Sequence, residues 1–500
     1  MSVTTEAGST TFESLNPATG EVVAEHPVHD EKAVGEAVDR AREAAVWWAA
    51  LGWKARRLRL LNFKGALTRN LNRMAELVHE ETGKPIQDAQ LETIMAITHL
   101  DWAARNAQKI LGPRSVFPGV MNINQKAVLE YRSLGVVGVI GPWNYPVFTP
   151  MGSIAYALAA GNAVVFKPSE FTPGVGVLLA ELFADVVPEQ PVFQVVTGLG
   201  ATGAALARSG VNKIAFTGSG PTAKKVMAAC AENLTPIVAE CGGKDACLVD
   251  EGADLDVAAG AAVWGAMSNA GQTCIGVERV YVVEKVYDSF VEKLTAAAKD
   301  LRAGDDSGAA YGPITMPGQL DIIERHINDA LAKGGRAVVG GAASVRRPYV
   351  EPVVLTDVPD DSSAVSEETF GPTITVHKVK NLEEGLEKAN NSTYGLAGSI
   401  FSGNKSHAMD VARRMRSGMT SINAVLAYAA IPALPFGGVG ESGFGRIHGA
   451  DGLREFARPK AITSQRFAPP MDLLSFDRTD KTMQRILQVV TMLHGKHYKR

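Results

Sequence analysis

The sequence predicts an α/β fold that is built on parallel sheets and divided into two domains. From Leu134 to Gly242, short apolar runs alternate with segments of helix length, a pattern typical of βαβ units. A second alternation of strands and helices follows Glu240. The chain has 500 residues, more than one hydrophobic core usually serves, so a division into domains is expected.

The elements are expected in the following order. Residues 31–110 place apolar and charged residues at a spacing of three to four, which predicts helices. Segment 113–133 breaks that pattern with Pro and Gly and then alternates, which predicts a hairpin. Five strands follow, at LGVVGVIGP, NAVVFKPSE, PVFQVVTG, NKIAFTGSG and TPIVAECGG, with helices over 149–160, 173–186, 201–209 and 221–233. Further strands are expected at VERVYVV, RAVVGG, YVEPVVLTDV, TITVHKV and GLAGSIFSG.

Composition argues against several classes of protein. An apolar content of 46%, a charged content of 21% and a net charge of −3 are typical of a soluble globular protein and give no broad face for nucleic acid. No run reaches the roughly 18 apolar residues of a membrane span, and the N-terminus lacks a signal-peptide pattern. Cys230, Cys241, Cys247 and Cys274 form no CxxC pair and have no His partners at zinc spacing. We therefore expect no metal site and a reducing, cytoplasmic setting.

Three turns that follow predicted strands are candidate phosphate or ribose sites. The GLGATG turn matches a dinucleotide motif formally, but no acidic residue follows about 20 positions later, so we interpret it as an ordinary turn. The FTGSG turn precedes a helix with Pro221 near its start, where free amides and the Ser219 hydroxyl bind anions. In FKPSE, the Glu170 carboxylate can accept from both hydroxyls of a ribose, and Lys167 can donate to one. Ordinary turn chemistry explains each alone, whereas together they favour a nucleotide.

Three other elements carry groups suited to carbonyl chemistry. GPWNYP is a rigid turn that can fix the Asn144 amide as a donor, and Glu240 closes a strand beside two glycines. Cys274 lies among small polar residues in NAGQTC, where a ligand can reach it. A thiolate nucleophile, an amide donor and a carboxylate base are what covalent carbonyl chemistry needs. Spacing alone leaves open a turn-forming Asn144, a surface Glu240 and an inert Cys274.

The motifs NPATGE, GPWNYP, KPSE, FTGS, ECGGK, GQTC, EETFGP and LPFGGVGESGFGR occur in this order along the chain. In this combination the chain resembles the NAD(P)-dependent aldehyde dehydrogenases over about residues 12–465. The resemblance implies a Rossmann-type cofactor domain, an α/β catalytic domain and small oligomerisation elements. The ending PFGGVGESGFGR…HG resembles the class 3 branch, which acts on medium-chain and aromatic aldehydes, whereas the long N-terminal portion resembles the tetrameric branches.

The resemblance also implies roles for the matching residues. Cys274 would attack the aldehyde carbon, its backbone amide and Asn144 would hold the oxyanion, and Glu240 would activate the water that hydrolyses the thioester. The implied cofactor contacts are Lys167 and Glu170 to the adenine ribose, Gly218 and Ser219 in the phosphate turn, Glu368 to the nicotinamide ribose, Phe370 near the ring, and Trp143 lining the same cleft. Cys241, after the base, and Gly220 and Pro221, after FTGS, depart from the family pattern.

The cofactor and the substrate are less specified. Glu170 would repel a 2′-phosphate, so NAD is expected, with NADP possible. Succinic-semialdehyde enzymes of the family carry an arginine where this chain has Gly152, which argues against a carboxylated substrate. We expect a hydrophobic or aromatic aldehyde, with a tunnel lined by Phe148, Met151, Trp264, Ile275 and Tyr428, each of which is equally typical of a core. The alternatives are succinate semialdehyde, a CoA-acylating enzyme, which would usually lack Glu240, and a non-enzymatic relative.

The resemblance implies a cofactor-binding domain over 1–112 and 132–240 and a catalytic domain over 241–445. Segments 113–131 and 446–500 would bridge subunits of a homodimer or homotetramer. The C-terminal extension has a short apolar face and basic flanks, formed by Ile486, Leu487, Val490 and Leu493, with Asp480 as a candidate cap. We expect it to pack on the protein, in preference to a membrane surface.

Overall fold

The computed structural model describes residues 10–468 and 475–496. By its contacts the chain divides into two compact units. The larger unit comprises Met1–Leu111 and Arg132–Arg458, and the smaller comprises Gly112–Tyr131 and Pro459–Arg500. The limits of the cofactor-binding and catalytic domains expected from the sequence stay a prediction.

A six-stranded sheet forms one half of the larger unit, in the order β19-β9-β8-β5-β6-β7. Five of its strands run parallel, and β19 is antiparallel to β9. Every residue of β5 and β6 is buried, as expected for central parallel strands. The five predicted strands are all present, and the sheet comprises β5 (Val136–Ile140), β6 (Ala163–Lys167), β7 (Phe193–Val195), β8 (Lys213–Gly218), β9 (Ile237–Cys241) and β19 (Gly443–Phe444).

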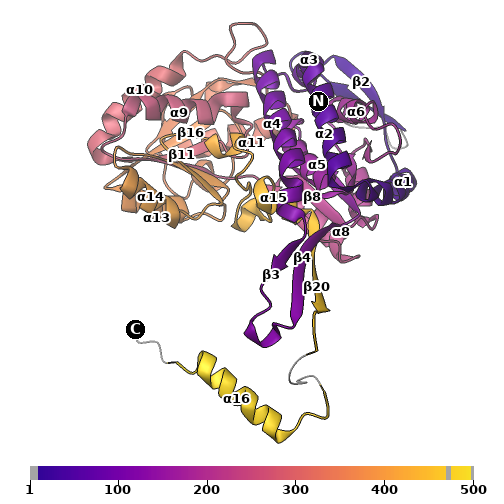
Figure 1. Ribbon diagram of the computed structural model, residues 1–500. Helices are drawn as coiled ribbons and strands as arrows, with labels where there is room; N and C mark the ends of the chain where they lie inside the picture. The colour runs from indigo at the N-terminus through magenta and orange to yellow at the C-terminus, as the bar shows by residue number, and fades with distance from the viewer. Residues whose placement is uncertain (1–9, 469–474, 497–500) are drawn as a thin grey trace. The chain divides into compact units, whose positions relative to one another are not determined.

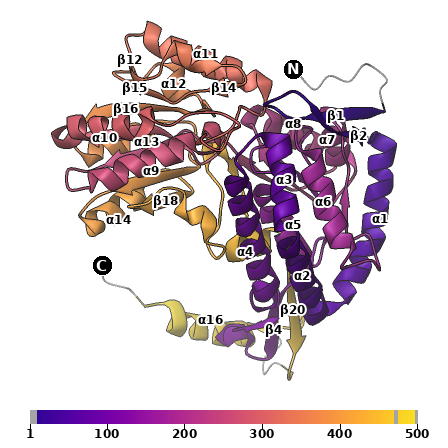
Figure 2. The same ribbon diagram turned by 90° about the horizontal axis from the view of Figure 1, so that it is seen from above.

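Helices follow the strands where the sequence predicted them. They are α5 (Phe148–Ala160), α6 (Pro173–Ala184), α7 (Gly200–Arg208) and α8 (Gly220–Ala231). The predicted N-terminal helical region, preceded by β1 (Thr11–Leu15) and β2 (Val22–Pro27), forms α1 (Glu31–Ala50), α2 (Gly52–Arg69), α3 (Leu71–Thr82) and α4 (Ile86–Leu111). In the larger unit α4 lies between its two halves, as both views show (Figures 1 and 2).

A seven-stranded sheet forms the other half of the larger unit, in the order β12-β15-β16-β11-β10-β17-β18. Only β12, at the edge, is antiparallel to its neighbour. Its strands are β10 (Asp245–Val249), β11 (Val277–Val283), β12 (Arg336–Val339), β15 (Val353–Thr356), β16 (Thr373–Val379), β17 (Ala397–Phe401) and β18 (Met419–Ile422). The remaining elements of this half are α9 (Leu255–Met267), η2 (Ser268–Gly271), α10 (Tyr287–Lys299), α11 (Pro317–Ala332), β13 (Val345–Arg346), β14 (Tyr349–Val350), α12 (Ser363–Ser366), α13 (Leu382–Asn390) and α14 (Lys405–Arg414). Helix α15 (Gly449–Glu455) packs instead on α4 and α5.

Among its described residues, the smaller unit contains most of a three-stranded sheet, the 3-10 helix η1 (Val120–Asn122) and the α-helix α16 (Asp480–His494). The predicted hairpin is confirmed, because β3 (Arg114–Val116) pairs antiparallel with β4 (Gln125–Ser133), and β20 (Ala457–Gln465) completes the sheet. Helix α16 is capped by Thr479, whose hydroxyl accepts from the Thr482 amide at 3.2 Å. The expectation of Asp480 as the cap is wrong, because this residue is already the first of the helix. Within the described residues, no helix combines the length and apolarity needed to cross a membrane.

Candidate active site

The predicted site residues lie at the carboxyl ends of neighbouring strands of the six-stranded sheet. Lys167 is the last residue of β6, Asn144 lies in the turn after β5, and Ser219 follows β8 directly. Glu240, near the end of β9, pairs in register with Thr217 of β8. Because these strands are parallel, their ends meet at one edge of the sheet, where ligands of α/β proteins bind.

Cys274 lies between η2 and β11, after a stretch of unusual backbone. Asn269 and Ala270 have φ of 53° and 56°, and Gly271 has φ of 70°. Left-handed backbone costs energy at residues other than glycine and is found most often where the surroundings demand it. A Cβ at Gly271 would lie 2.1 Å from the carbonyl carbon and oxygen of Gly371. The backbone of this segment therefore lies directly against the backbone of the loop before β16.

Buried amide side chains hold the segment before Cys274. Gln272 Nε2 donates to the carbonyl oxygens of Asn269 at 2.9 Å and Pro313 at 3.2 Å, and its Oε1 accepts from the Thr315 amide at 2.8 Å. Asn269 Nδ2 donates to the carbonyl oxygens of Gln272 and Asn144, each at 3.1 Å. These bonds satisfy both buried side chains and offset part of the cost of the left-handed backbone.

The Asn144 turn is joined to the same segment at two points. Asn144 Nδ2 donates to the carbonyl oxygen of Gln272 at 2.9 Å. The hydroxyl groups of Tyr145 and Thr273 lie 3.0 Å apart. Because a side-chain amide has two N–H donors, Asn144 can donate a second hydrogen bond. The turn after β5 and the cysteine segment are thus brought together from opposite halves of the larger unit.

Glu240 and Cys274 interact at this junction. Glu240 is buried, and neither carboxyl oxygen makes a hydrogen bond of ordinary geometry to a described residue. Burial raises the pKa of Glu240 to about 8, partly offset by an interaction with the Cys274 thiol. Burial, followed by the charges of Glu240, Asp245 and Glu368, raises the pKa of Cys274 well above its usual value. The site therefore holds a protonated thiol beside a carboxyl group that titrates near neutral pH.

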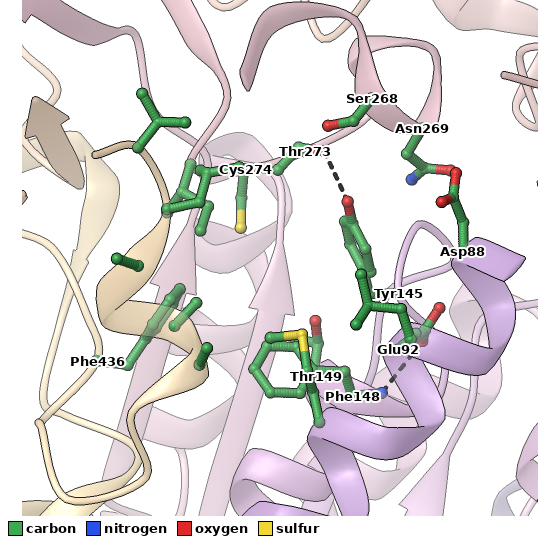
Figure 3. Close-up of a pocket in the computed structure, with 18 of the residues that line it drawn as sticks. Asp88, Glu92, Tyr145, Phe148, Thr149, Ser268, Asn269, Thr273, Cys274 and Phe436 are labelled. Atoms are coloured by element: carbon green, nitrogen blue, oxygen red, sulfur yellow. Dashed lines mark hydrogen bonds between the residues drawn. The ribbon is translucent and has the colours of Figure 1, made fainter. Parts of the chain in front are cut away.

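Cys274 and Glu240 both line a pocket of about 290 Å³. The Cys274 sulfur points into it, toward the aromatic side chains of Phe148 and Phe436 (Figure 3). Most of the wall is apolar, with the larger side chains being Leu91, Met95, Phe148, Trp264, Ile275, Val425, Leu426, Phe436 and Ile447. Asn144 is not among the lining residues, although its neighbour Tyr145 is.

The charged groups in the pocket wall are mainly acidic. Lys84 lies here, but its Nζ is 2.6 Å from Glu92 Oε2 and both side chains are buried. Asp88 also lines the pocket, and burial raises the pKa of its carboxyl group. In this part of the described chain the wall therefore offers two carboxyl groups besides Glu240, and a cation that is already paired.

A histidine takes the space beside Gly152 on α5. A Cβ at Gly152 would lie 2.4 Å from His448 Nε2. The His448 ring lies with its centroid 4.0 Å from that of His99 and lines the pocket. Burial lowers the pKa of His448 well below its usual value, so the imidazole is neutral. Any side chain at position 152 would have to displace this ring.

The candidate adenosine and phosphate residues lie at the ends of β6 and β8. Lys167 Nζ and Glu170 Oε2 are 3.2 Å apart. Ser219, which follows Gly218, is the N-cap of α8, but its hydroxyl donates to Thr222 at 3.0 Å and caps no backbone amide. The first amides of α8 therefore have no side-chain acceptor, as an anion-binding helix start requires.

The candidate nicotinamide residues lie between the two halves of the larger unit. The rings of Trp143 and Phe370 meet edge to face, with centroids 5.6 Å apart. Phe370 has a left-handed backbone, and its amide donates to Glu278 Oε1 at 2.9 Å. Glu368 accepts from the Gly243 amide at 3.1 Å, and burial raises the pKa of Glu368 to about 8. In the described residues no group of His, Cys, Asp and Glu is arranged to hold a metal ion.

Comparison with known proteins identifies the family. The sequence profile of the aldehyde dehydrogenase family matches residues 3–462. The chain belongs to the aldehyde dehydrogenase family. As a member, it is an oxidoreductase that acts on aldehydes, which confirms the reaction class expected from the sequence motifs.

Related proteins cover nearly the whole chain. The chain is 36% identical over 470 residues to 4,4'-diapolycopene aldehyde oxidase of Methylomonas sp., covering 93% of this chain and 87% of that protein. It is 34% identical over 489 residues to a protein assigned as a succinate-semialdehyde dehydrogenase (NADP+) in Mycolicibacterium smegmatis, covering 96% and 94%. The structure matches lactaldehyde dehydrogenase from Escherichia coli with a TM-score of 0.88 and 32% identity, covering 92% and 96%. This similarity confirms the predicted α/β fold.

Among the residues expected to line the tunnel of this family member, Phe148, Trp264 and Ile275 do so. The expectation is wrong for Met151 and Tyr428, which are buried but are not among the residues that line the pocket. Several lining residues were missed, namely Leu91, Met95, Val425, Phe436 and Ile447. The available signal was the position of Phe436 within the LPFGGVGESGFGR motif, whereas Leu91, Met95 and Val425 belong to no motif.

Proposed function

We propose that the protein oxidises an aldehyde to the carboxylic acid through a covalent intermediate on Cys274, with NAD or NADP as the electron acceptor. The observation that carries this proposal is the pocket shared by Cys274 and Glu240, with the Asn144 amide bonded to the segment that leads into Cys274. A thiol, a carboxyl base and a fixed amide donor are the groups that this reaction requires.

The steps follow from the proton positions. Glu240 accepts the proton of the Cys274 thiol, and the sulfur bonds to the aldehyde carbon. The charge that develops on the aldehyde oxygen is stabilised by the free N–H of Asn144 and by the Cys274 backbone amide. When bound, the nicotinamide cofactor supplies the two-electron oxidation by accepting a hydride. Glu240, after releasing its proton to solvent, deprotonates a water whose oxygen bonds to the thioester carbon. The carbon–sulfur bond then breaks and releases the acid and Cys274.

The cofactor residues fit a dinucleotide. Lys167 and Glu170 would hold the adenine ribose, and the uncapped start of α8 at Gly218 and Ser219 would hold the pyrophosphate. Towards the nicotinamide, the proposed contacts are Glu368 to the ribose and Phe370 and Trp143 to the ring side of the cleft. We propose NAD as the preferred cofactor, because Glu170 opposes a 2′-phosphate. NADP is the alternative cofactor, since Lys167 can pair with a 2′-phosphate if Glu170 turns away. The name of one relative specifies NADP+.

The proposed substrate is a hydrophobic or aromatic aldehyde. The wall of the pocket is mostly apolar, and apolar surface binds an apolar chain without the cost of desolvating a charge. His448 fills the space in which an arginine at position 152 would start, and Lys84 is committed to Glu92. A substrate carboxylate would therefore meet Asp88 and Glu92 without a free cation nearby.

Succinate semialdehyde is the alternative substrate, supported by the names of several relatives. A CoA-acylating reaction is a weaker alternative, because Glu240 stands ready to activate water. Assembly into a homodimer or homotetramer and a cytoplasmic location stay predictions. No partner besides the small-molecule substrate and cofactor is proposed.

The test is reduction of NAD and, separately, of NADP by the purified protein with acetaldehyde, hexanal, benzaldehyde and succinic semialdehyde. We expect hexanal or benzaldehyde to exceed succinic semialdehyde in kcat/KM by at least about tenfold, since a buried unpaired carboxylate is costly. Cys274→Ala should abolish the reaction, whereas Cys230→Ala, at a buried thiol outside the pocket, should not. A preference for succinic semialdehyde would overturn the substrate proposal and leave the reaction class intact.

A further inference from the structure

A buried ion pair makes hydrogen bonds to the backbone of the turn that carries Asn144. Lys84 and Glu92 have side chains that are 1% and 0% exposed. Lys84 Nζ donates to the Asn144 carbonyl oxygen at 2.8 Å. Glu92 Oε1 accepts from the backbone amides of Val147 at 2.7 Å and Phe148 at 3.1 Å. The two charges therefore hold the turn on both sides of Pro146, in addition to holding each other.

The position of this pair is better explained by geometry than by stability. Removing two charges from water costs several kcal/mol per ion, and a well-packed apolar pair is often equally stable. Here every strong contact of the pair that reaches beyond its own helix and loop goes to the Asn144 turn, including the Lys84 ammonium 4.2 Å from the Tyr145 ring centroid. The partner Glu92 lies on α4, a 26-residue helix that provides a rigid support.

The segment before Cys274 also makes hydrogen bonds to this turn. The Asn144 carbonyl oxygen accepts from both Lys84 Nζ and Asn269 Nδ2, while the Asn144 side chain donates to Gln272. With its carbonyl fixed from two directions, Asn144 has little freedom to shift its side-chain amide. A displacement of about 1 Å in such a donor can cost on the order of 10²-fold in rate.

We infer that Lys84 and Glu92 are positioning residues of the reaction, which set the Asn144 amide relative to Cys274 by clamping the backbone of its turn. The inference rests on the proposed function, in which Asn144 donates to the developing oxyanion. It assigns the buried cation of the pocket a task other than binding a substrate carboxylate.

The test is the neutral double variant Lys84→Met with Glu92→Gln. Gln at position 92 keeps an oxygen acceptor for the two amides, and no unpaired charge is left in the interior. We expect kcat to fall by about 10- to 100-fold with the KM for aldehyde within about threefold of the wild type, because the lost contact acts on the oxyanion donor. Hydrolysis of 4-nitrophenyl acetate, which needs the thiol and the donor but no cofactor, should fall by a similar factor.

A double-mutant cycle separates positioning from a general structural role. In an Asn144→Ala background, the same two substitutions should lower kcat by less than about threefold, because the donor they position is already absent. The matched control is Lys213→Met with Glu455→Gln, an ion pair of a buried lysine and a partly exposed glutamate that makes no contact with the turn. This control should retain wild-type kcat. If the double variant does not fold, Lys84→Gln with Glu92→Gln, which also leaves no unpaired charge, is read in the same way.

Two results would overturn the inference. One is a wild-type kcat in the double variant, and the other is a loss that is fully additive with Asn144→Ala. Both require an active wild-type enzyme, so they leave the proposed function standing. A wild type that oxidises no aldehyde with either cofactor would instead remove the proposed function, and this inference with it.

Discussion

The side-chain amide of Asn144 donates a hydrogen bond to the backbone carbonyl of Gln272, two residues before Cys274. Asn144 follows a strand of the six-stranded sheet, and Gln272 precedes a strand of the seven-stranded sheet. The bond therefore links the proposed oxyanion donor directly to the segment of the proposed nucleophile. Loss of the Asn144 side-chain amide should change the reaction more than it changes the fold.

Asn144→Ala is the most direct test of that donor. We expect kcat to fall by about 10²- to 10³-fold with a small change in KM, because the donor acts on charge that develops only in the transition state. Steady-state kinetics with the best aldehyde would measure this. Asn106→Ala is the matched control, because Asn106 also donates to a backbone carbonyl, that of Trp102, but within α4. A normal kcat in Asn144→Ala would contradict the assignment.

Activity should depend on pH through Glu240. Because burial raises the pKa of this carboxyl group to about 8, it is mostly protonated at pH 7 and cannot act as a base in that form. We expect kcat to rise from pH 6.5 to pH 9 under conditions where hydrolysis limits the rate. Glu240→Gln should lower kcat sharply and remove the rise. A wild-type profile that is flat over this interval would argue against Glu240 as the base.

The same carboxyl group should make the fold less stable as pH rises. Its pKa is raised in the folded state from 4.5 to about 8, so the folded protein holds a proton that the unfolded chain releases. The contribution of Glu240 to the free energy of unfolding is therefore full below about pH 4.5 and is lost as pH rises through 8. Glu240→Gln should gain stability relative to the wild type by on the order of 1 kcal/mol for each pH unit in that window. Thermal unfolding of both proteins at pH 6 and pH 8.5 would measure the difference, and a gain in Glu240→Gln that is the same at both pH values would refute the prediction.

Gly152→Ala should destabilise the protein through His448. The added Cβ would lie 2.4 Å from the His448 Nε2, so the ring must move, and overpacking of this kind costs about 1–3 kcal/mol. Adding His448→Ala should recover part of the loss. Gly260→Ala is the control, because a Cβ there meets nothing within 4 Å on α9. The melting temperatures of the four proteins would decide this, and equal losses at both glycines would contradict the steric account.

Cofactor preference should respond to Glu170. Glu170→Ser removes the carboxylate that opposes a 2′-phosphate and frees Lys167 from its 3.2 Å contact. We expect kcat/KM for NADP to rise relative to NAD by about tenfold or more. Glu181→Ser, on the following helix, serves as a surface control. An unchanged ratio would mean that other residues read the ribose.

Much of the fold was predictable because its signals are local. Each strand of the six-stranded sheet that the sequence predicted is short, apolar and followed by a turn. The burial of β5 and β6 could therefore be predicted from a few consecutive apolar residues. The start of α16 shows the limit of such reasoning. Thr479 and Asp480 are adjacent and both can cap a helix, and only the backbone determines which one does.

The pocket was less predictable because its wall is assembled from distant segments. Phe148 and Ile275 lie beside motifs and could be suggested, but Met95 and Ile447 come from opposite ends of the chain and carry no motif. Met151 is one turn from Phe148 on the same helix but does not line the pocket. Because α5 is buried on every side, it has no polar face that would reveal the orientation of either residue. The pairing of Lys84 with Glu92, which removes a cation from the pocket, was likewise invisible in the sequence.

The close approach of Gly271 to Gly371 has a consequence for engineering. The segment before Cys274 and the loop that carries Glu368 and Phe370 touch through main-chain atoms, with no side chains between them to absorb a change in shape. Substrate-side and cofactor-side loops from other proteins cannot be exchanged independently here. In a chimaera, the segment before Cys274 and the loop with Glu368 and Phe370 must therefore be transferred together. Transfer of one alone would separate the nucleophile from the groups proposed to lie beside the nicotinamide.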